Sequence, residues 1–285
     1  MYFIILLQQL IASTTHIVAK TITTDLSAPL VLLFRAGTAS LAFVALFLFR
    51  REKFFRIERN DVPKFILLGA LNIPLNQFLF LTAIKHTTAP NVALAYALTP
   101  AFVFILALIF LKEKATWMKL LGIAVAITGT VMILFEKGFS ADSDHLLGNI
   151  LGLLASLSWA MYTVLGKNFS QKYGAVYSIA MSMFIGFLLY IPVYFLTGTE
   201  FRVSTITLPQ WGQIAYLGIV TSCIAYVLWY YALKHTDASK VSVFNNLQPI
   251  LTTIMAVAFL GQSLTLIFII GGILIIAGVY ITQRS

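Results

Sequence analysis

Apolar runs of about 20 residues recur along the whole chain and limit what it can fold into. A helix needs about 20 such residues to cross the hydrocarbon core of a bilayer, which is about 30 Å thick. We expect a spanning helix at each of 3–22, 28–49, 63–83, 90–111, 116–135, 146–166, 173–197, 211–232, 239–260 and 264–282. The segments between these runs are short and polar, so none of them has room for a soluble domain. The sequence therefore predicts an all-α membrane protein with ten transmembrane helices.

Composition and charge support this prediction. The chain is 60% hydrophobic and 10% charged, whereas a soluble domain has about 25% charged residues. The net charge of +9 does not indicate a nucleic-acid partner, because Lys and Arg lie in the short loops between apolar runs. Most of them fall on one side if the chain starts in the cytoplasm. The positive-inside rule then predicts that both termini are cytoplasmic. The membrane we expect is a bacterial inner membrane.

A sequence repeat divides the chain into two halves. Ala-Ile-Lys-His-Thr at 83–87 recurs as Ala-Leu-Lys-His-Thr 149 residues later, and Pro249 follows Pro100 at the same interval. We expect a first five-helix repeat over 1–138 and a second over 146–285. Because five is an odd number, the second half must enter the membrane from the opposite side. Inverted repeats of this kind are typical of secondary transporters.

The two related prolines fall near the middle of the fourth and ninth predicted spans. Proline inside a helix removes one hydrogen bond and kinks the helix. Pro100 would free the carbonyl of Tyr96, and Pro249 that of Asn245. We interpret the two prolines as hinges beside a cavity at the bilayer midplane. The alternative is a pair of packing kinks that neighbouring helices absorb.

Polar side chains within the predicted spans are the candidate lining of that cavity. Amide and phenol groups in the hydrocarbon region are unfavourable unless they find partners or water. The candidates for substrate binding are Asn72, Asn76, Tyr96, Trp159, Tyr162, Tyr226, Asn245 and Gln248. The alternative interpretation is that these groups join helices by hydrogen bonds, as Asn and Gln commonly do in membranes.

Two basic residues also lie within the spans. His16 is the candidate proton carrier; alternatively, it is neutral and bonded to a neighbouring helix. Arg35 is expected to be structural, either reaching the outer interface or bonding backbone carbonyls. Every Asp and Glu falls in a loop or at a helix end, so a buried carboxylate that drives proton or cation exchange is not expected. The sequence shows no catalytic, metal or cofactor motif, and we do not expect an enzyme.

Taken together, these features resemble the drug/metabolite transporter superfamily, and specifically its EamA-like family. The resemblance covers nearly the whole chain. In the first half it is carried by Arg35, 83–89, Pro100, 111–114, Gly122 and Gly129, and in the second half by Trp159, Ala160, Lys167, 232–236, Pro249, Gly271 and Gly278. It departs from the family pattern at Gln262, because the family usually has Glu after the fourth helix of each half, as at Glu113.

The resemblance implies a central path lined by the first, third, fourth, sixth, eighth and ninth spans. The fifth and tenth spans would lie at the periphery, where a homodimer contact could form. Similar transporters commonly export amino acids or related metabolites. We therefore expect a secondary transporter of small polar solutes that works by alternating access and needs no cofactor. The alternatives are a multidrug efflux transporter, a channel or scramblase-like passage, and a membrane adaptor that transports nothing.

Overall fold

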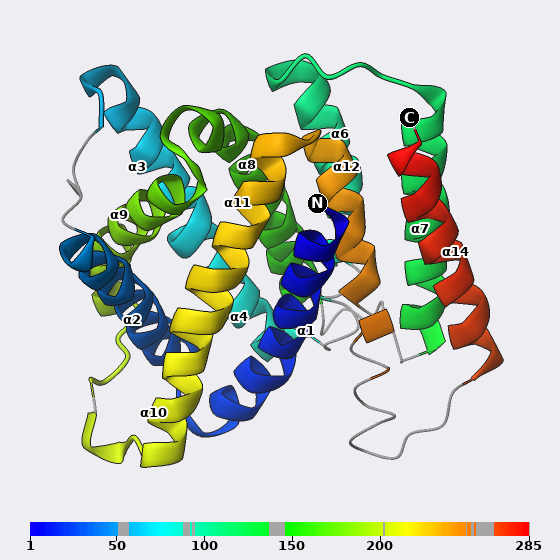
Figure 1. Cartoon of the computed structure of the whole chain (residues 1–285). Coiled ribbons are helices and arrows are strands. Elements are labelled where there is room, and N and C mark those ends of the chain that lie inside the picture. Colours follow the sequence, from blue (N-terminus) through cyan, green and yellow to red (C-terminus); the bar gives the residue numbers. More distant parts are fainter. Residues whose placement is uncertain are drawn as a thin grey trace.

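The computed structural model describes residues 1–50, 57–87, 92, 95–136, 146–201, 203–248, 250–251, 254 and 265–284, and the elements in these ranges are all helical. In chain order they are α1 (Tyr2–Asp25), α2 (Ala28–Phe49), η1 (Arg59–Asp61), α3 (Val62–Ala70), η2 (Leu71–Gln77), α4 (Phe78–His86), α6 (Thr99–Phe110), α7 (Trp117–Glu136), α8 (Leu146–Tyr173), α9 (Ala175–Leu196), η4 (Val203–Thr205), α10 (Leu208–Ala215), η5 (Tyr216–Ile224), α11 (Ala225–His235), α12 (Ala238–Ser242), η6 (Val243–Leu247) and α14 (Leu266–Gln283). Figure 1 shows them as one bundle.

Seven helices of the described residues are long and apolar enough to cross a membrane. They are Tyr2–Asp25, Ala28–Phe49, Arg59–His86, Leu146–Tyr173, Ala175–Leu196, Leu208–His235 and Leu266–Gln283, and two shorter apolar helices cover Ala95–Phe110 and Trp117–Ile133. The predicted all-helical membrane fold is thereby confirmed. The number of ten spans stays a prediction, because the ninth predicted span lies partly outside the described residues.

Large apolar side chains face outward from these helices. Leu41 of α2, Leu188 of α9 and Ile273 of α14 are exposed even though each lies well inside a long helix. Water would penalise such a surface, whereas lipid tails accommodate it. The outer surface of the bundle therefore suits a bilayer.

The third predicted span of each half contains a π-helical segment at the same place. Residues 71–75 of η2 and 220–224 of η5 are 149 residues apart, which is the interval of the sequence repeat. In η2 the cause is Pro74, which has no N–H for the helical ladder. In η5 the hydroxyls of Thr221 and Ser222 both donate to the Leu217 carbonyl, at 2.7 and 2.9 Å. Side-chain bonds of this kind compete with the backbone ladder.

The sixth span is longer than the sequence predicted. We expected a helix over 146–166, but α8 continues through the polar residues that follow and ends at Tyr173. Ser170 stabilises this extension by donating to the carbonyl of Tyr230, at 2.7 Å. The helix stops where Gly174 takes a φ of 85°, a left-handed conformation that glycine adopts without strain. The turn into α9 is therefore only one residue long.

Helices α7 and α14 pack backbone to backbone through glycine, and Figure 1 shows them side by side at one edge of the bundle. A Cβ added to Gly271 would lie 2.8 Å from the carbonyl oxygen of Gly129, and one added to Gly278 would lie 2.5 Å from the amide of Ala126. Small residues permit this close approach in membranes. These glycines are used within the chain, so the predicted homodimer contact would need other faces of the two helices.

Polar contacts between loops show which loops share an end of the bundle. At one end Lys172 pairs with Asp61 at 2.6 Å, and Lys240 donates to the carbonyl of Gln283 at 3.3 Å. A separate contact joins the end of α1 to the start of the eighth span, where the Gln210 side chain donates to Asp25 at 3.2 Å. Each contact joins loops that the positive-inside rule assigned to the same side. Both chain ends also lie toward the upper part of the bundle in Figure 1.

Candidate functional site

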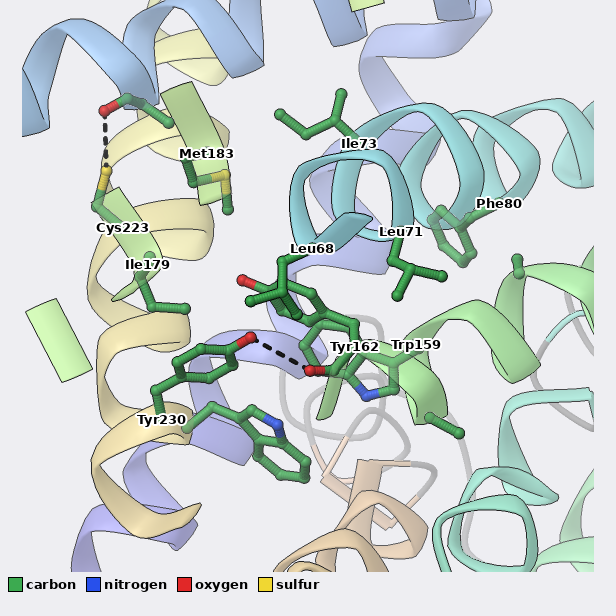
Figure 2. Close-up of a cluster of buried hydrophobic side chains, with 14 of the residues drawn as sticks. Leu68, Leu71, Ile73, Phe80, Trp159, Tyr162, Ile179, Met183, Cys223 and Tyr230 are labelled. Carbon is green, nitrogen blue, oxygen red and sulfur yellow. Dashed lines mark hydrogen bonds between the residues drawn. The ribbon is translucent and has the colours of Figure 1, made fainter. Parts of the chain in front are cut away.

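Aromatic side chains of α8 and α11 meet in the middle of the bundle (Figure 2). The ring centre of Trp159 lies 5.2 Å from that of Tyr226 and 5.6 Å from that of Tyr162. Trp159 also contacts Trp229, whose indole N–H donates to Thr163 at 3.2 Å. Because α8 and α11 are long apolar helices whose aromatic residues recur every three or four positions, these rings fall on facing sides. Three of the predicted lining residues are thus neighbours.

The π-helical segment η2 directs two asparagines toward α8. The Asn76 amide donates to the hydroxyl of Tyr96 at 2.7 Å and to the carbonyl of Ala155 at 2.9 Å. The Asn72 amide donates to the hydroxyl of Tyr162, at 3.4 Å, and accepts from Gln77 at 3.0 Å. Asn72 is fully buried, and Asn76 nearly so. Asn76 therefore joins the third span to the fourth and sixth, and Asn72 joins it to the sixth and, through the sulfur of Met183, to the seventh.

Gln9 of α1 joins the other two predicted lining residues. Its amide donates to the Asn245 side chain at 3.0 Å, and its carbonyl oxygen accepts from Gln248 at 3.0 Å. Gln9 has no exposed surface, and the sequence analysis did not select it. The signal was present, since Gln8 and Gln9 interrupt the apolar run that opens the first span. Among the described residues, neither polar atom of the buried Asn246 amide has a hydrogen-bond partner.

Arg35 of α2 is buried within the bundle, with 4% of its surface exposed. Its Nε donates to the hydroxyl of Ser222 at 2.8 Å, and its Nη2 to the hydroxyl of Thr221 at 3.4 Å. Both acceptors belong to η5 of the second half. The expectation that Arg35 reaches the outer interface or bonds backbone carbonyls is therefore wrong, because side-chain hydroxyls of a packed neighbouring helix hold it inside.

The structure describes one of the two predicted hinges. Pro100 is the second residue of α6, and the helix is interrupted just before it by a turn at Leu98. Beside it, the hydroxyls of Thr99 and Ser156 are 2.8 Å apart. Pro249 and the side chain of His16 lie outside what the structure describes, as does Gln262. The roles of His16 and of the two prolines stay predictions.

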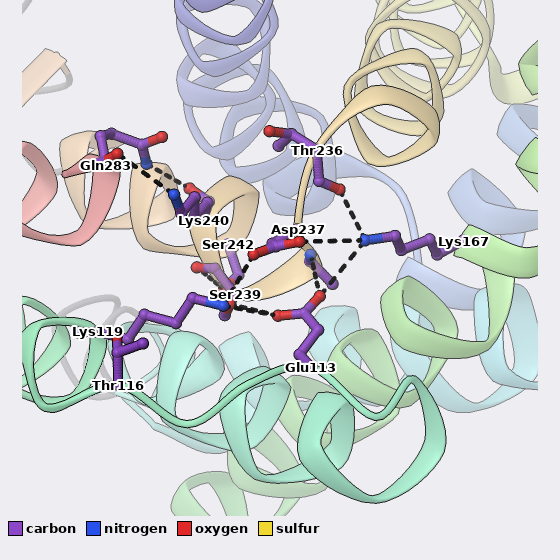
Figure 3. A network of polar contacts seen from close by, with 11 residues as sticks. Glu113, Thr116, Lys119, Lys167, Thr236, Asp237, Ser239, Lys240, Ser242 and Gln283 are labelled. Carbon is purple, nitrogen blue, oxygen red and sulfur yellow. Dashed lines mark hydrogen bonds and ion pairs between the residues drawn. The ribbon is translucent and has the colours of Figure 1, made fainter. Parts of the chain in front are cut away.

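A buried ionic network joins loops of the two halves (Figure 3). Glu113, which follows α6, accepts from the backbone N–H of Ala238 at 2.6 Å and from the hydroxyl of Ser239 at 2.5 Å. Lys167 lies 3.4 Å and Lys119 3.5 Å from the same carboxylate. The Glu113 carboxylate thus caps the first turn of α12, where it complements the free N–H groups and the helix dipole.

Asp237 completes this network, 2.8 Å from Lys119. Burial raises the pKa of the Asp237 carboxyl, but the hydrogen bond and charge of Lys119, with the charges of Lys167 and Lys240, outweigh that effect and hold its pKa below the usual value. A surface recess of about 510 Å³ opens over the network. It is lined by Leu111, Lys112, Glu113, Lys114, Thr116, Lys119, Lys167, Asn168, Gln171 and Asp237. The recess therefore lies over this network, away from the aromatic cluster.

Comparison with known proteins now decides the family. The model of the EamA-like transporter family matches residues 1–135 and 146–284. The chain belongs to the EamA-like transporter family. The resemblance drawn from the sequence is confirmed, and with it the expectation of a membrane-embedded transporter of small molecules.

Relatives in the EamA-like family agree with this assignment. The uncharacterized transporter YyaM of Bacillus subtilis is 30% identical over 86% of this chain and 81% of its own length. An uncharacterized transporter of Archaeoglobus fulgidus is 35% identical over 74% of this chain and 72% of its own. A probable terminal-alkyne amino-acid exporter of Streptantibioticus cattleyicolor is 27% identical, over 80% of this chain and 75% of its own.

The fold also has a solved counterpart. One crystal structure superposes with a TM-score of 0.84 over 99% of this chain and 96% of that chain, at 18% identity. At this identity the likeness shows the fold alone.

Proposed function

We propose that this EamA-family transporter moves small polar metabolites, amino acids or related compounds, out of a bacterial cell across its inner membrane. The observation that carries the proposal is the convergence of amide and aromatic side chains from both halves. Asn76 of the first half bonds both Tyr96 and α8, and Trp159 of α8 meets Tyr226 of α11. The relative named as an amino-acid exporter supports the same class of solute.

The chemistry of these side chains suits such solutes. Amides both donate and accept hydrogen bonds, so they match neutral and zwitterionic groups. Aromatic rings add apolar surface for a side chain and attract an ammonium group to their faces. Tyr96 and Tyr226 keep part of their surface accessible although they lie deep in the bundle, which supports a wet space between the halves.

The proposed mechanism is alternating access. The two halves rock about the central site, with Pro100 and Pro249 as hinges, so that the site faces one compartment at a time. The network of Glu113, Lys119, Lys167 and Asp237 joins loops of both halves on the side assigned to the cytoplasm. In this mechanism it closes the cytoplasmic side and separates when that side opens.

A paired measurement tests the proposal. Metabolites are profiled inside and outside cells with and without the protein, and the solutes that change are followed in liposomes containing the purified chain. The double variant Asn245→Leu with Gln248→Leu is expected to lower the transport rate at least about 10-fold, because a polar solute loses two partners. Thr128→Leu is the matched control, since Thr128 is exposed on α7 and bonds only its own helix.

Parental transport by the double variant would refute the assigned lining. An unchanged metabolite profile, together with liposomes that move no polar metabolite, would refute the transport proposal.

A further inference from the structure

Arg35 carries a buried positive charge that no negative charge of the described residues balances. The guanidinium remains protonated in proteins, and its side chain is 4% exposed. Its two hydrogen-bond acceptors are neutral hydroxyls, and the ion pairs found in the described part of the chain do not include it. An uncompensated charge inside a membrane protein is costly and usually marks a ligand or ion path.

The hydroxyls hold the guanidinium by one edge only. Nε and Nη2, which form its side edge, donate to Ser222 and Thr221. The hydroxyl protons of these residues are already given to the Leu217 carbonyl, at 2.9 and 2.7 Å. Their lone pairs are therefore fixed toward Arg35, and the plane of the guanidinium is fixed with them. The π-helical form of η5 makes this possible, because it directs both hydroxyls to one carbonyl.

The opposite edge of the guanidinium has no partner in the described part of the chain. Of the five N–H donors of an arginine, the two named bonds use one on Nε and one on Nη2. Both protons of Nη1 and the second proton of Nη2 have no acceptor among the described residues. Nη1 and Nη2 together form a planar fork, which can bind a carboxylate through two parallel hydrogen bonds.

The surroundings of Arg35 place it beside the candidate path. The phenols of Tyr226 and Tyr96 lie near enough to Arg35 to interact with it electrostatically, and they also contact Trp159 and Asn76 respectively. Gly218 brings the helices close enough for this arrangement, since a Cβ there would lie 3.0 Å from the Arg35 carbonyl oxygen. One cation, two phenols and an aromatic cluster therefore share one region between α2, α8 and α11.

We propose that the open fork of Arg35 binds a carboxylate group of the transported solute. The inference rests on the proposed transport function and narrows it to solutes that carry a carboxylate, such as free amino acids. The bound carboxylate neutralises the buried charge, and the aromatic cluster receives the rest of the solute. The mid-membrane parts of the predicted spans contain no Asp or Glu that would compete for Arg35.

Transport of matched solute pairs tests this proposal. Liposomes containing the full-length protein are loaded with a mixture of the common amino acids, or with the corresponding carboxamides, which lack only the negative charge. Release is followed by mass spectrometry. The wild-type protein is expected to favour acids over amides by on the order of 10- to 100-fold, the range of a charge-assisted bond. In Arg35→Gln this ratio is expected to fall to about one.

Two further variants keep the test decisive. Arg35→Lys keeps the charge without the fork, so its preference for acids is expected to lie between those of the wild type and Arg35→Gln, and it replaces Arg35→Gln if that variant does not fold. Arg59→Gln removes an exposed charge from η1 and is expected to leave the ratio unchanged.

Each remaining outcome has one meaning. Equal release of acids and amides by the wild type, or an unchanged preference in both Arg35 variants, overturns the carboxylate site and leaves the proposed transport intact. Release of neither mixture by the wild type refutes transport of amino-acid-like solutes, and the carboxylate site with it.

Discussion

Among single residues, Gln9 shows how the candidate site is held together. Its side chain joins α1 to Asn245 and Gln248 of the ninth predicted span. One amide group that donates to Asn245 and accepts from Gln248 fixes the orientation of all three side chains. Loss of Gln9 would therefore remove one hydrogen bond from each of two half-buried amides, Asn245 and Gln248.

A double-mutant cycle measures this coupling. Gln9→Leu and Asn245→Leu are each expected to destabilise the protein, whereas the double variant loses less than the sum. The expected coupling energy is about 0.5–1.5 kcal/mol, the range of a single hydrogen bond in a membrane protein. Melting temperatures in detergent report it, with Thr128→Leu as the control. Strictly additive effects would show that the Gln9–Asn245 bond adds nothing.

The Asp237 carboxyl predicts how stability depends on pH. Its pKa is lower in the folded protein than in the unfolded chain, so its ionised form stabilises the fold at pH values above about 3.9. That contribution is lost as pH falls through the folded pKa. At pH 7 the melting temperature of the wild type is expected to be higher than that of Asp237→Asn. This difference in melting temperature should shrink below about pH 4. A difference of the same size at pH 7 and pH 3 would contradict this assignment.

At the residue level, the sequence could nominate candidate residues but not their partners. Asn72, Asn76 and Gln248 could be selected because an amide is conspicuous in an apolar run. Their hydrogen-bond partners could not, since Gln9 and Gln248 are 239 residues apart and helical periodicity says nothing of contacts between spans. Arg35 was misjudged for the same reason, because its acceptors lie on the eighth span.

Among the elements, the contact between α7 and α14 has the clearest sequence origin. Gly122 and Gly129, like Gly271 and Gly278, are seven residues apart, which is about two helical turns and places each pair on one face. The sequence indicated close packing at these glycines without naming the partner helix. The π-helical segments in the third and eighth spans were only partly predictable. Pro74 indicates an irregularity in η2, but η5 contains no proline.

Two neighbouring glycines of α14 give a matched test of this packing. An added Cβ at Gly271 would lie 2.7 Å from Ile133 and 2.8 Å from the backbone of Gly129, whereas one at Gly272 would meet nothing nearer than 3.9 Å. Gly271→Ala is expected to destabilise the protein by about 1–3 kcal/mol. Gly272→Ala is expected to be neutral or slightly stabilising, because alanine favours helix. Thermal melting of both variants decides it, and equal effects would refute the packing argument.

In the whole molecule, Glu113 connects the halves. Its carboxylate is 6% exposed and lies between Lys167 and Lys119, while Ala238 and Ser239 of the second half donate to it. The positive-inside rule predicted that these loops share a side. It could not predict that they touch, because charge counts do not place loops relative to one another. The opposite orientation of the two halves in the membrane stays a prediction, and so does the midplane cavity.

Chemical labelling tests whether the Glu113 network closes one side. In a Cys223→Ser background, a cysteine replaces Ser242, which is fully buried in α12 behind the network. Glu113→Gln is expected to raise the rate of labelling by a membrane-impermeant maleimide on the order of 10-fold, because a charged hydrogen-bond acceptor is lost. Glu58→Gln is the control, since Glu58 is 64% exposed in its pair with Lys172 and such pairs contribute little. An unchanged rate would refute the closure.

The glycine contact between α7 and α14 has a consequence for the proposed rocking motion. One helix ends the first half and the other ends the second, and glycine lets their backbones approach closely, with the side chain of Ile133 packed against Gly271. A separation at this edge would break that contact. In the proposed mechanism we therefore expect this edge to be the fulcrum, with the largest displacements at the opposite edge, around α2 and α9.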